Sequence, residues 1–145
     1  MIAIASDHGA YLQKEALKKH LLSQGYELED FGTYSEESCD YPIFAAKAAR
    51  AVADGTCDRG IVLCTTGIGA SIAANKVRGI RCALCSDPLS AALTRAHNDS
   101  NMLALAGGII GEKLMLHITD IWLKTPFEGG RHQRRIDQIG EIENH

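Results

Sequence analysis

The sequence predicts an α/β protein built on a Rossmann-like, doubly wound parallel sheet of five strands. Short apolar runs alternate with amphipathic helical segments along the whole chain, which is the pattern of repeated strand–helix units. The run at residues 60–63 is continuously apolar, as in a central parallel strand that is covered on both faces. With 145 residues, 46% of them hydrophobic and 23% charged, the chain fits one domain, residues 1–145, with a sizeable core.

The strands and helices are expected to alternate as follows. The strands cover residues 2–5, 26–31, 60–63, 80–85 and 102–106. The helices cover residues 11–24, a segment that begins at Pro42, and residues 68–75, 88–97, 111–124 and 131–143. Proline suits the first turn of a helix, as at Pro42 and Pro88, and Gly25 ends the first helix. Residues 127–130, Phe-Glu-Gly-Gly, form a hinge before the last, polar helix.

We expect the strand order 2-1-3-4-5, with right-handed crossovers between the strands. Ligands in such folds bind beyond the carboxyl ends of the strands, at the point where the order reverses, which here lies between strands 1 and 3. Two loops reach this point: residues 7–9 after the first strand and residues 64–69 after the third. These two loops are therefore the first candidates for a functional site.

The loop at residues 64–69, Cys-Thr-Thr-Gly-Ile-Gly, combines a thiol with two glycines at the start of a helix. Its successive backbone N–H groups and the helix N-terminus form a cradle for a phosphate or a developing oxyanion. The loop lacks the lysine of a Walker A motif and the third glycine of a dinucleotide fingerprint. A helix N-terminus favours the thiolate form of Cys64. From spacing alone, Cys64 could equally be the buried end of a strand.

Other polar residues that could bind a ligand or take part in catalysis lie in turns or on the last helix. Asp7 and His8 end the first strand, where Asp7 could cap the first helix, bind a ligand, or do both. A polar turn at residues 97–101 precedes the fifth strand, and Asn and Asp favour such turns. Arg131 and Arg135 share one helix face and suit a phosphate dianion, although a solvated terminal helix is the commoner case.

The topology separates these groups into two sets. Residues 97–101 and Arg131 follow helices, so they should lie near the amino ends of strands, whereas Asp7 and Cys64 should lie near the carboxyl ends. One small subunit can hardly bring the two sets together. A site that uses both must be shared between the subunits of a symmetric dimer.

Composition excludes several classes of protein. The net charge of −3 gives no global attraction to nucleic acid or to an anionic membrane surface. No apolar run approaches the ~20 residues of a membrane span, and the first residues lack the basic region of a signal peptide, so we expect a cytoplasmic protein. The five cysteines are an odd number, which argues against a disulfide framework. Cys82 and Cys85 lie three apart on one strand and should face opposite sides of the sheet as buried apolar residues.

Several motifs occur in order over essentially the whole chain. They are Ser-Asp-His-Gly at 6–9, Asp-Tyr-Pro at 40–42, the run at 64–76, His-Asn-Asp at 97–99 and Glu-Gly-Gly-Arg-His at 128–132. Together they resemble the type B ribose-5-phosphate isomerase family, which includes galactose-6-phosphate isomerase subunits and enzymes acting on allose or tetrulose phosphates. The resemblance implies a homodimer, sometimes a dimer of dimers, whose C-terminal helix extends to the partner subunit. It also implies neither a metal nor an organic cofactor.

The resemblance also implies roles for single residues. Cys64 matches the cysteine that abstracts the proton, Thr66 matches the hydroxyl beside it, and His97 matches the histidine that opens the sugar ring. The positions that match substrate contacts are Asp7, His8, Tyr41, Thr65, Gly67, Ile68, Gly69, Asn98, Arg131 and Arg135, with residues 65–69 as the anion hole and the two arginines as phosphate ligands.

Two positions depart from the family pattern. The family motif usually reads Cys-Gly-Thr-Gly, and Thr65 stands here in place of the first glycine. The family also usually places a basic residue, commonly Arg, at the position of Gly108, so that one phosphate ligand is missing. These two changes leave open a sugar phosphate other than ribose 5-phosphate as the substrate.

The resulting hypothesis is an aldose–ketose isomerase that interconverts ribose 5-phosphate and ribulose 5-phosphate through an enediolate. One alternative keeps the reaction and changes the sugar to a tetrulose 4-phosphate, allose 6-phosphate or galactose 6-phosphate. A second alternative is a non-catalytic flavodoxin-like binding module, which leaves the thiol at the switch point unexplained. A redox enzyme built on Cys82 and Cys85 is a distant further alternative, because their side chains should face apart.

Overall fold

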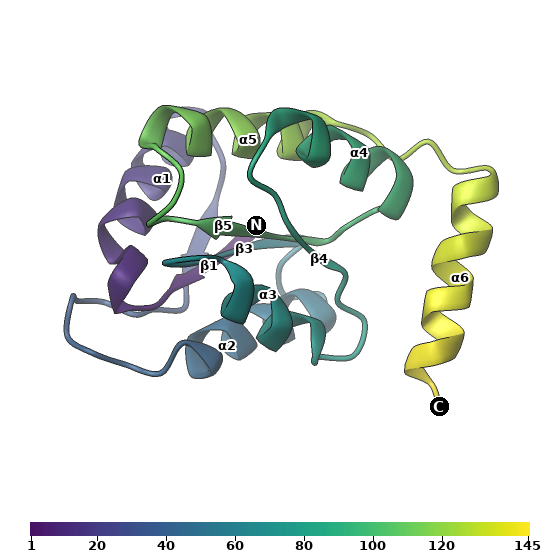
Figure 1. Cartoon of the computed structure of the whole chain (residues 1–145), viewed down its shortest axis with the longest axis horizontal. Coiled ribbons are helices and arrows are strands. Elements are labelled where there is room, and N and C mark those ends of the chain that lie inside the picture. The colour runs from purple at the N-terminus through teal and green to yellow at the C-terminus, as the bar shows by residue number, and fades with distance from the viewer.

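Five parallel strands form the central sheet of the computed structural model, which describes all residues 1–145 (Figure 1). The strands are β1 (Ile2–Ser6), β2 (Leu28–Asp30), β3 (Arg59–Cys64), β4 (Cys82–Leu84) and β5 (Met102–Ala106). Their order in the sheet is β2-β1-β3-β5-β4, and every neighbouring pair is parallel. The predicted fold class is therefore confirmed.

The predicted strand order is wrong at one edge of the sheet, where β5 and not β4 lies beside β3. All five residues of β5 are buried, so this strand needs a neighbour on each side. The three residues of β4 are half-buried or exposed, as expected of an edge strand. The switch point is unchanged, because β1 still pairs with β3, with Ser6 opposite Leu63 at their carboxyl ends.

Helices cover both faces of the sheet. On one face lie α1 (Tyr11–Ser23), α4 (Pro88–Asn98) and α5 (Glu112–Lys124), and on the other lie α2 (Tyr41–Ala53) and α3 (Ile68–Asn75) (Figure 1). A short 3-10 turn, η1 (His8–Ala10), joins β1 to α1. The last helix, α6 (Arg131–Glu143), belongs to neither layer and stands at the edge of the molecule beside α4 (Figure 1). No helix of the chain combines the length and the apolar character that crossing a membrane requires.

The two faces of the sheet have cores of different character. Alternate residues of a strand point to opposite faces, so Ile2 and Ile4 of β1 enter one core and Ala3 and Ala5 enter the other. The core under α2 and α3 is rich in alanine, which lets these helices pack close to the sheet. The core under α1, α4 and α5 holds the large side chains, including the fully buried Trp122. Both layers are thereby fixed against the strands that carry the loops of interest.

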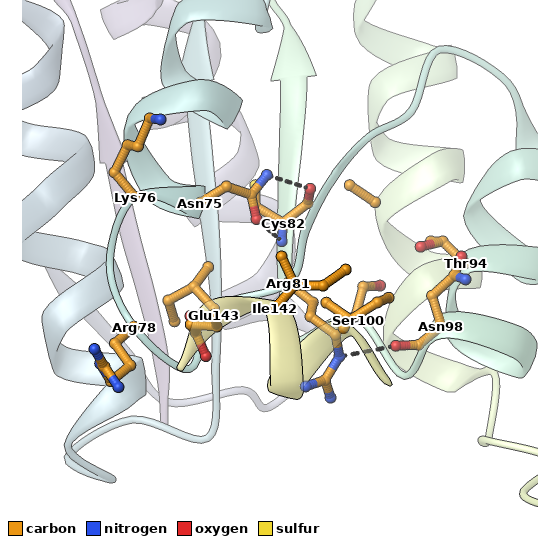
Figure 2. A pocket seen from close by; sticks show the side chains of 13 residues that line it. Asn75, Lys76, Arg78, Arg81, Cys82, Thr94, Asn98, Ser100, Ile142 and Glu143 are labelled. Atoms are coloured by element: carbon orange, nitrogen blue, oxygen red, sulfur yellow. Dashed lines mark hydrogen bonds between the residues drawn. The ribbon is translucent and has the colours of Figure 1, made fainter. Parts of the chain in front are cut away.

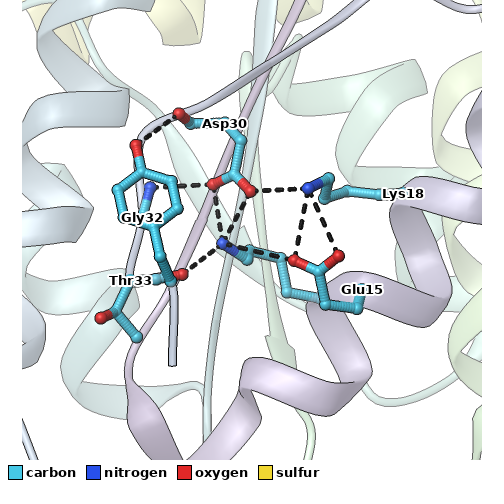
Figure 3. Close-up of polar contacts among 7 residues, drawn as sticks. Glu15, Lys18, Asp30, Gly32 and Thr33 are labelled. Carbon is cyan, nitrogen blue, oxygen red and sulfur yellow. Dashed lines mark hydrogen bonds and ion pairs between the residues drawn. The ribbon is translucent and has the colours of Figure 1, made fainter. Parts of the chain in front are cut away.

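One fully buried cation holds the loop that follows β2. Lys14 of α1 is 0% exposed, and its Nζ donates to both carboxylate oxygens of Asp30, at 2.7 and 2.8 Å, and to the backbone carbonyl of Thr33 (Figure 3). Lys18 donates to the same carboxylate at 2.8 Å, as does the Gly32 N–H. Burial alone would raise the pKa of Asp30, but these hydrogen bonds outweigh it and hold the pKa below its usual range. The segment from Asp30 to Thr33 is thereby tied to α1.

Replacing Lys14 by Met should therefore destabilise the protein. The Lys14→Met variant leaves the Thr33 carbonyl without its donor. It also leaves the Asp30 carboxylate with Lys18 as its one remaining cationic partner. We therefore expect the free energy of unfolding at pH 7 to fall by about 3 kcal/mol. Urea unfolding measures this difference, with the exposed Lys19→Met as a matched control. Because the pKa of Asp30 is lowered by folding, its contribution is present above about pH 4 and lost as pH falls further, so the two curves should converge in acid. Equal stability of Lys14→Met and the wild type at pH 7 would contradict this account.

Candidate active site

The carboxyl ends of β1 and β3 open into a cavity of about 420 Å³. Its lining comes from the loops after these strands and from the starts of α2 and α3. The lining residues are Asp7, Tyr41, Cys64, Thr65, Thr66, Ile68, Gly69 and Ile72. All but Ile72 are residues that the sequence predicted for the site, so the structure brings these predicted residues together. The predicted His8 and Gly67 are not among the lining residues.

The Cys64 thiol lies at the head of the turn that enters α3, and it is 5% exposed. The backbone N–H of Gly67 donates to Cys64 Sγ at 3.2 Å. Gly67 reaches this position with a left-handed φ of 73°, and a Cβ on it would lie 2.5 Å from Leu84 Cδ1 and 2.9 Å from the Leu105 carbonyl carbon. Only glycine therefore allows the turn that brings a hydrogen-bond donor to the sulfur. This hydrogen bond fixes the sulfur at the wall of the cavity.

The same turn presents further backbone donors. The N–H groups of Thr65, Thr66, Gly69 and Ala70 donate to no group within the chain, whereas the Ile68 N–H donates to Thr66 Oγ1 at 3.2 Å. Successive free amides beside a helix N-terminus are a binding site for negative charge. The turn can therefore hold an oxyanion that forms next to the thiol.

Asp7 and His8 follow β1 and are held by defined hydrogen bonds, but only Asp7 lines the cavity. Asp7 is buried and its Oδ1 accepts the Ala10 N–H at 3.1 Å, so it caps the η1 turn and lines the cavity at the same time. His8 Nδ1 accepts the backbone N–H of Cys39 at 3.1 Å. We infer that the neutral His8 ring carries its proton on Nε2, because Nδ1 acts as the acceptor. Cys39 is a contact that sequence reasoning missed, since it lies far from His8 along the chain.

Tyr41 lies over the start of α3. A Cβ on Gly69 would stand 2.5 Å from Tyr41 Cζ and 2.7 Å from its hydroxyl oxygen. The absence of a side chain at Gly69 therefore allows the phenol to reach the cavity, where a hydroxyl can contact a polar ligand.

The second predicted set lies at the other end of the sheet. The His97 ring stacks on His132, with ring centroids 4.3 Å apart and an angle of 13° between the planes. Glu128 Oε2 lies 3.4 Å from His132 Nε2 and 3.9 Å from His97 Nε2. Arg131 and Arg135 are exposed on α6. The carboxylate and the second imidazole are partners of His97 that the sequence did not assign to the site.

A larger cavity, of about 750 Å³, lies beside this set, between α6, α4 and the turn from α3 to β4 (Figure 2). Asn98 lines it, and the Asn98 backbone carbonyl accepts a hydrogen bond from Arg81 Nε at 3.0 Å (Figure 2). Ile139 and Ile142 of α6 form its apolar side. The cavity is at the amino ends of β4 and β5 and does not contain the thiol.

The two sets do not meet within one chain. Asn98 precedes the start of β5 by a few residues, while Cys64 pairs with Ala106, the last residue of β5. From its first to its last residue, β5 spans about 13 Å at about 3.3 Å per residue. The structure therefore brings together Asp7, Tyr41 and Cys64 and separates them from His97 and the arginines.

The cysteines other than Cys64 show no sign of redox chemistry. All five are free thiols. Cys82 packs against the core under α2 and α3, and Cys85 is buried in the core on the other face, as predicted. Burial raises the pKa of Cys82 to about 12 and that of Cys85 to about 11, so both remain protonated.

Doubly wound α/β proteins bind ligands at the switch point of the sheet, and the free amides at that point suit a negatively charged group. The family model described as Ribose/Galactose Isomerase matches residues 2–139, and the chain belongs to this family. The sequence-based assignment is thereby confirmed.

Named relatives and solved structures agree with this membership. Ribose-5-phosphate isomerase B of Escherichia coli is 48% identical over 98% of the chain and 95% of the relative. The structure of Clostridium thermocellum ribose-5-phosphate isomerase B is 54% identical, with a TM-score of 0.98 over 99% of this chain and 97% of that one. The Mycoplasma genitalium ribose-5-phosphate isomerase B, solved with bound ribulose-5-phosphate, is 40% identical, with a TM-score of 0.94 over 99% of this chain and 96% of that one.

Gly67→Ala tests the turn that holds the thiol. The new Cβ would meet fixed backbone of Leu105 as well as a side chain, so we expect a loss of roughly 2–4 kcal/mol in the free energy of unfolding. Displacement of Cys64 should also lower isomerase turnover by about 10²-fold.

Gly55→Ala is the matched control, because Gly55 also has a left-handed φ, 85°, but nothing lies within 4 Å of its Cβ position. It should lose only about 1 kcal/mol and keep its activity. Urea unfolding and turnover measure both effects, and the account of the turn would be wrong if the two variants behaved alike.

Proposed function

We propose that the chain is an aldose–ketose isomerase that interconverts ribose 5-phosphate and ribulose 5-phosphate, with Cys64 as the base. The observation that carries the proposal is the buried thiol at the switch point, which accepts the Gly67 N–H and stands beside free loop amides. The likeness to ribose-5-phosphate isomerase B of E. coli, and to the M. genitalium structure with ribulose-5-phosphate, supports the choice of a pentose.

The proposed reaction moves protons along the first two carbons of the open-chain sugar. The Cys64 thiolate takes the proton from C2, and the C2–H electron pair forms the C1–C2 double bond of an enediolate, with the charge moving to O1. The free amides of Thr65, Thr66, Gly69 and Ala70 hold this charge where it develops. A proton passes from O2 to O1 beside Thr66, and Cys64 returns its proton to C1 while the carbonyl forms at C2. The atoms and electrons of the aldose and the ketose balance, so these steps need no cofactor.

The remaining predicted residues serve the same site from a second copy of the chain. His97 assists ring opening by proton transfer to the ring oxygen, and the nearby Glu128 and His132 orient its ring. Asn98 contacts the sugar, and Arg131 and Arg135 bind the phosphate as forked cations. This assignment follows from the separation of the two sets by the length of β5, which a symmetric dimer overcomes.

Exposed apolar side chains support the dimer. Several large apolar side chains on the helices are exposed, and burial against a second copy would remove them from water. Ile72 is 56% exposed, Leu89 66% and Ile142 74%, and they come from α3, α4 and α6. We further propose a cytoplasmic location, which the five free thiols support.

Cys64→Ala tests the role of the thiol. We expect kcat for ribose 5-phosphate to fall by about 10²–10⁴-fold, and exchange of the C2 proton with deuterated solvent to stop, because the base is gone. Cys57→Ala is the matched control, since Cys57 is equally buried but lies before the start of β3. Retained exchange in Cys64→Ala would contradict the assignment, and a wild-type chain without any exchange would point to a binding module.

The identity of the substrate is tested by comparing kcat/KM across four-, five- and six-carbon aldose phosphates. The proposal predicts the highest kcat/KM for ribose 5-phosphate. A higher value for a tetrose 4-phosphate, allose 6-phosphate or galactose 6-phosphate would replace the pentose while keeping the reaction.

A further inference from the structure

The side chain of Thr65 sits between three loops at the carboxyl edge of the sheet. The Thr65 carbonyl accepts the Gly108 N–H at 2.9 Å, and the Cys64 carbonyl accepts the Gly107 N–H at 2.9 Å, so the chain after β3 stays paired with the chain after β5. Thr65 lines the cavity of the thiol and is exposed there. Its hydroxyl makes no hydrogen bond within the chain, whereas that of Thr66 accepts the Ile68 N–H.

Two glycines flank this side chain. A Cβ on Gly9 would stand 2.6 Å from Thr65 Oγ1, and a Cβ on Gly108 would stand 2.6 Å from Thr65 Cγ2 and 3.1 Å from the Thr65 carbonyl oxygen. Neither glycine has a left-handed φ, so the backbone at both positions would accept any L-residue. A side chain at either position would therefore force the side chain of Thr65 to shift.

The two departures from the family pattern, Thr65 and Gly108, are thus in direct contact. The Thr65 methyl group occupies the place where a side chain at position 108 would begin. A charged side chain at 108 and a β-branched side chain at 65 exclude each other. The site consequently has a neutral hydroxyl at this corner in place of a cation.

We propose that Thr65 is a specificity-determining residue whose free hydroxyl donates a hydrogen bond to an oxygen of the bound sugar phosphate, and whose side chain would have to shift to admit a side chain at position 9 or 108. This inference rests on the proposed isomerase function for its ligand, but its packing claim does not. The hydroxyl contact is made in substrate and transition state alike, so it contributes to binding and not to the chemical step.

The packing claim is tested by a double-mutant cycle in thermal unfolding. Gly108→Ala should lower the melting temperature by about 3–10 °C, because the added methyl group meets Thr65 Cγ2 and a backbone carbonyl. In the Thr65→Ser background, which lacks Cγ2, the same substitution should lower it by less than half as much. Gly111→Ala is the control, since nothing lies within 4 Å of its Cβ position and its φ is ordinary. Equal effects of Gly108→Ala in both backgrounds would overturn the packing claim.

The hydroxyl claim is tested by Thr65→Val, which keeps the branched shape and removes the donor. We expect KM for ribose 5-phosphate to rise about 5–10-fold with kcat within about twofold of the wild type. Thr65→Ser, which keeps the hydroxyl, should hold KM near the wild-type value. An unchanged KM in Thr65→Val, or a loss confined to kcat, would overturn the contact. A wild-type chain without turnover of any sugar phosphate would instead overturn the proposed function, and the melting temperatures would still decide the packing claim.

Discussion

The parallel pairing of β1, β3 and β5 is the constraint on which the placement of every chemical group depends. Because the three buried strands run in one direction, all their carboxyl ends meet at one edge of the sheet and all their amino ends at the other. The thiol, Asp7 and the free amides follow strands and so gather at the first edge. His97 lies in the last turn of α4, and this helix brings it to the second edge. A parallel sheet thus divides the polar residues of one chain into two half-sites about a strand length apart.

At the carboxyl edge, the loops are held by close contacts of backbone and not by large side chains. Gly67 lets the turn after β3 fold back on Cys64, and the side chain of Thr65 fits between Gly9 and Gly108. On the far side, the buried Lys14 ties the chain after β2 to α1. These contacts of Lys14 fix the beginning of the segment that leads to Cys39. The Cys39 N–H in turn donates a hydrogen bond to His8 Nδ1. The position of the groups that line the cavity therefore also depends on residues outside it, such as Lys14.

Much of this arrangement could be predicted from the sequence, because hydrophobic periodicity and the alternation of strands and helices are local signals. The β1–β3 switch point and the grouping of Asp7 with Cys64 follow from topology alone. The position of β5 beside β3 could not be read in this way, since 80–85 and 102–106 are both apolar and only burial in the folded sheet distinguishes an edge strand. Contacts between distant residues, such as Cys39 with His8 or Thr65 with Gly108, need three-dimensional packing. Thr65 and Gly108, the two positions that depart from the family pattern, are in contact in the folded chain and so form a single feature.

The central claim is that one working site combines the carboxyl edge of one chain with the amino edge of another. Mixing Cys64→Ala and His97→Asn chains, after dissociation and reassembly, tests it most directly. Each hybrid dimer would contain one site with both defects and one site with none, so random pairing should restore about a quarter of wild-type activity from two inactive proteins. If both residues acted within the same chain, every site of the mixture would keep one defect. An inactive mixture in which hybrid dimers are demonstrably formed would contradict the account.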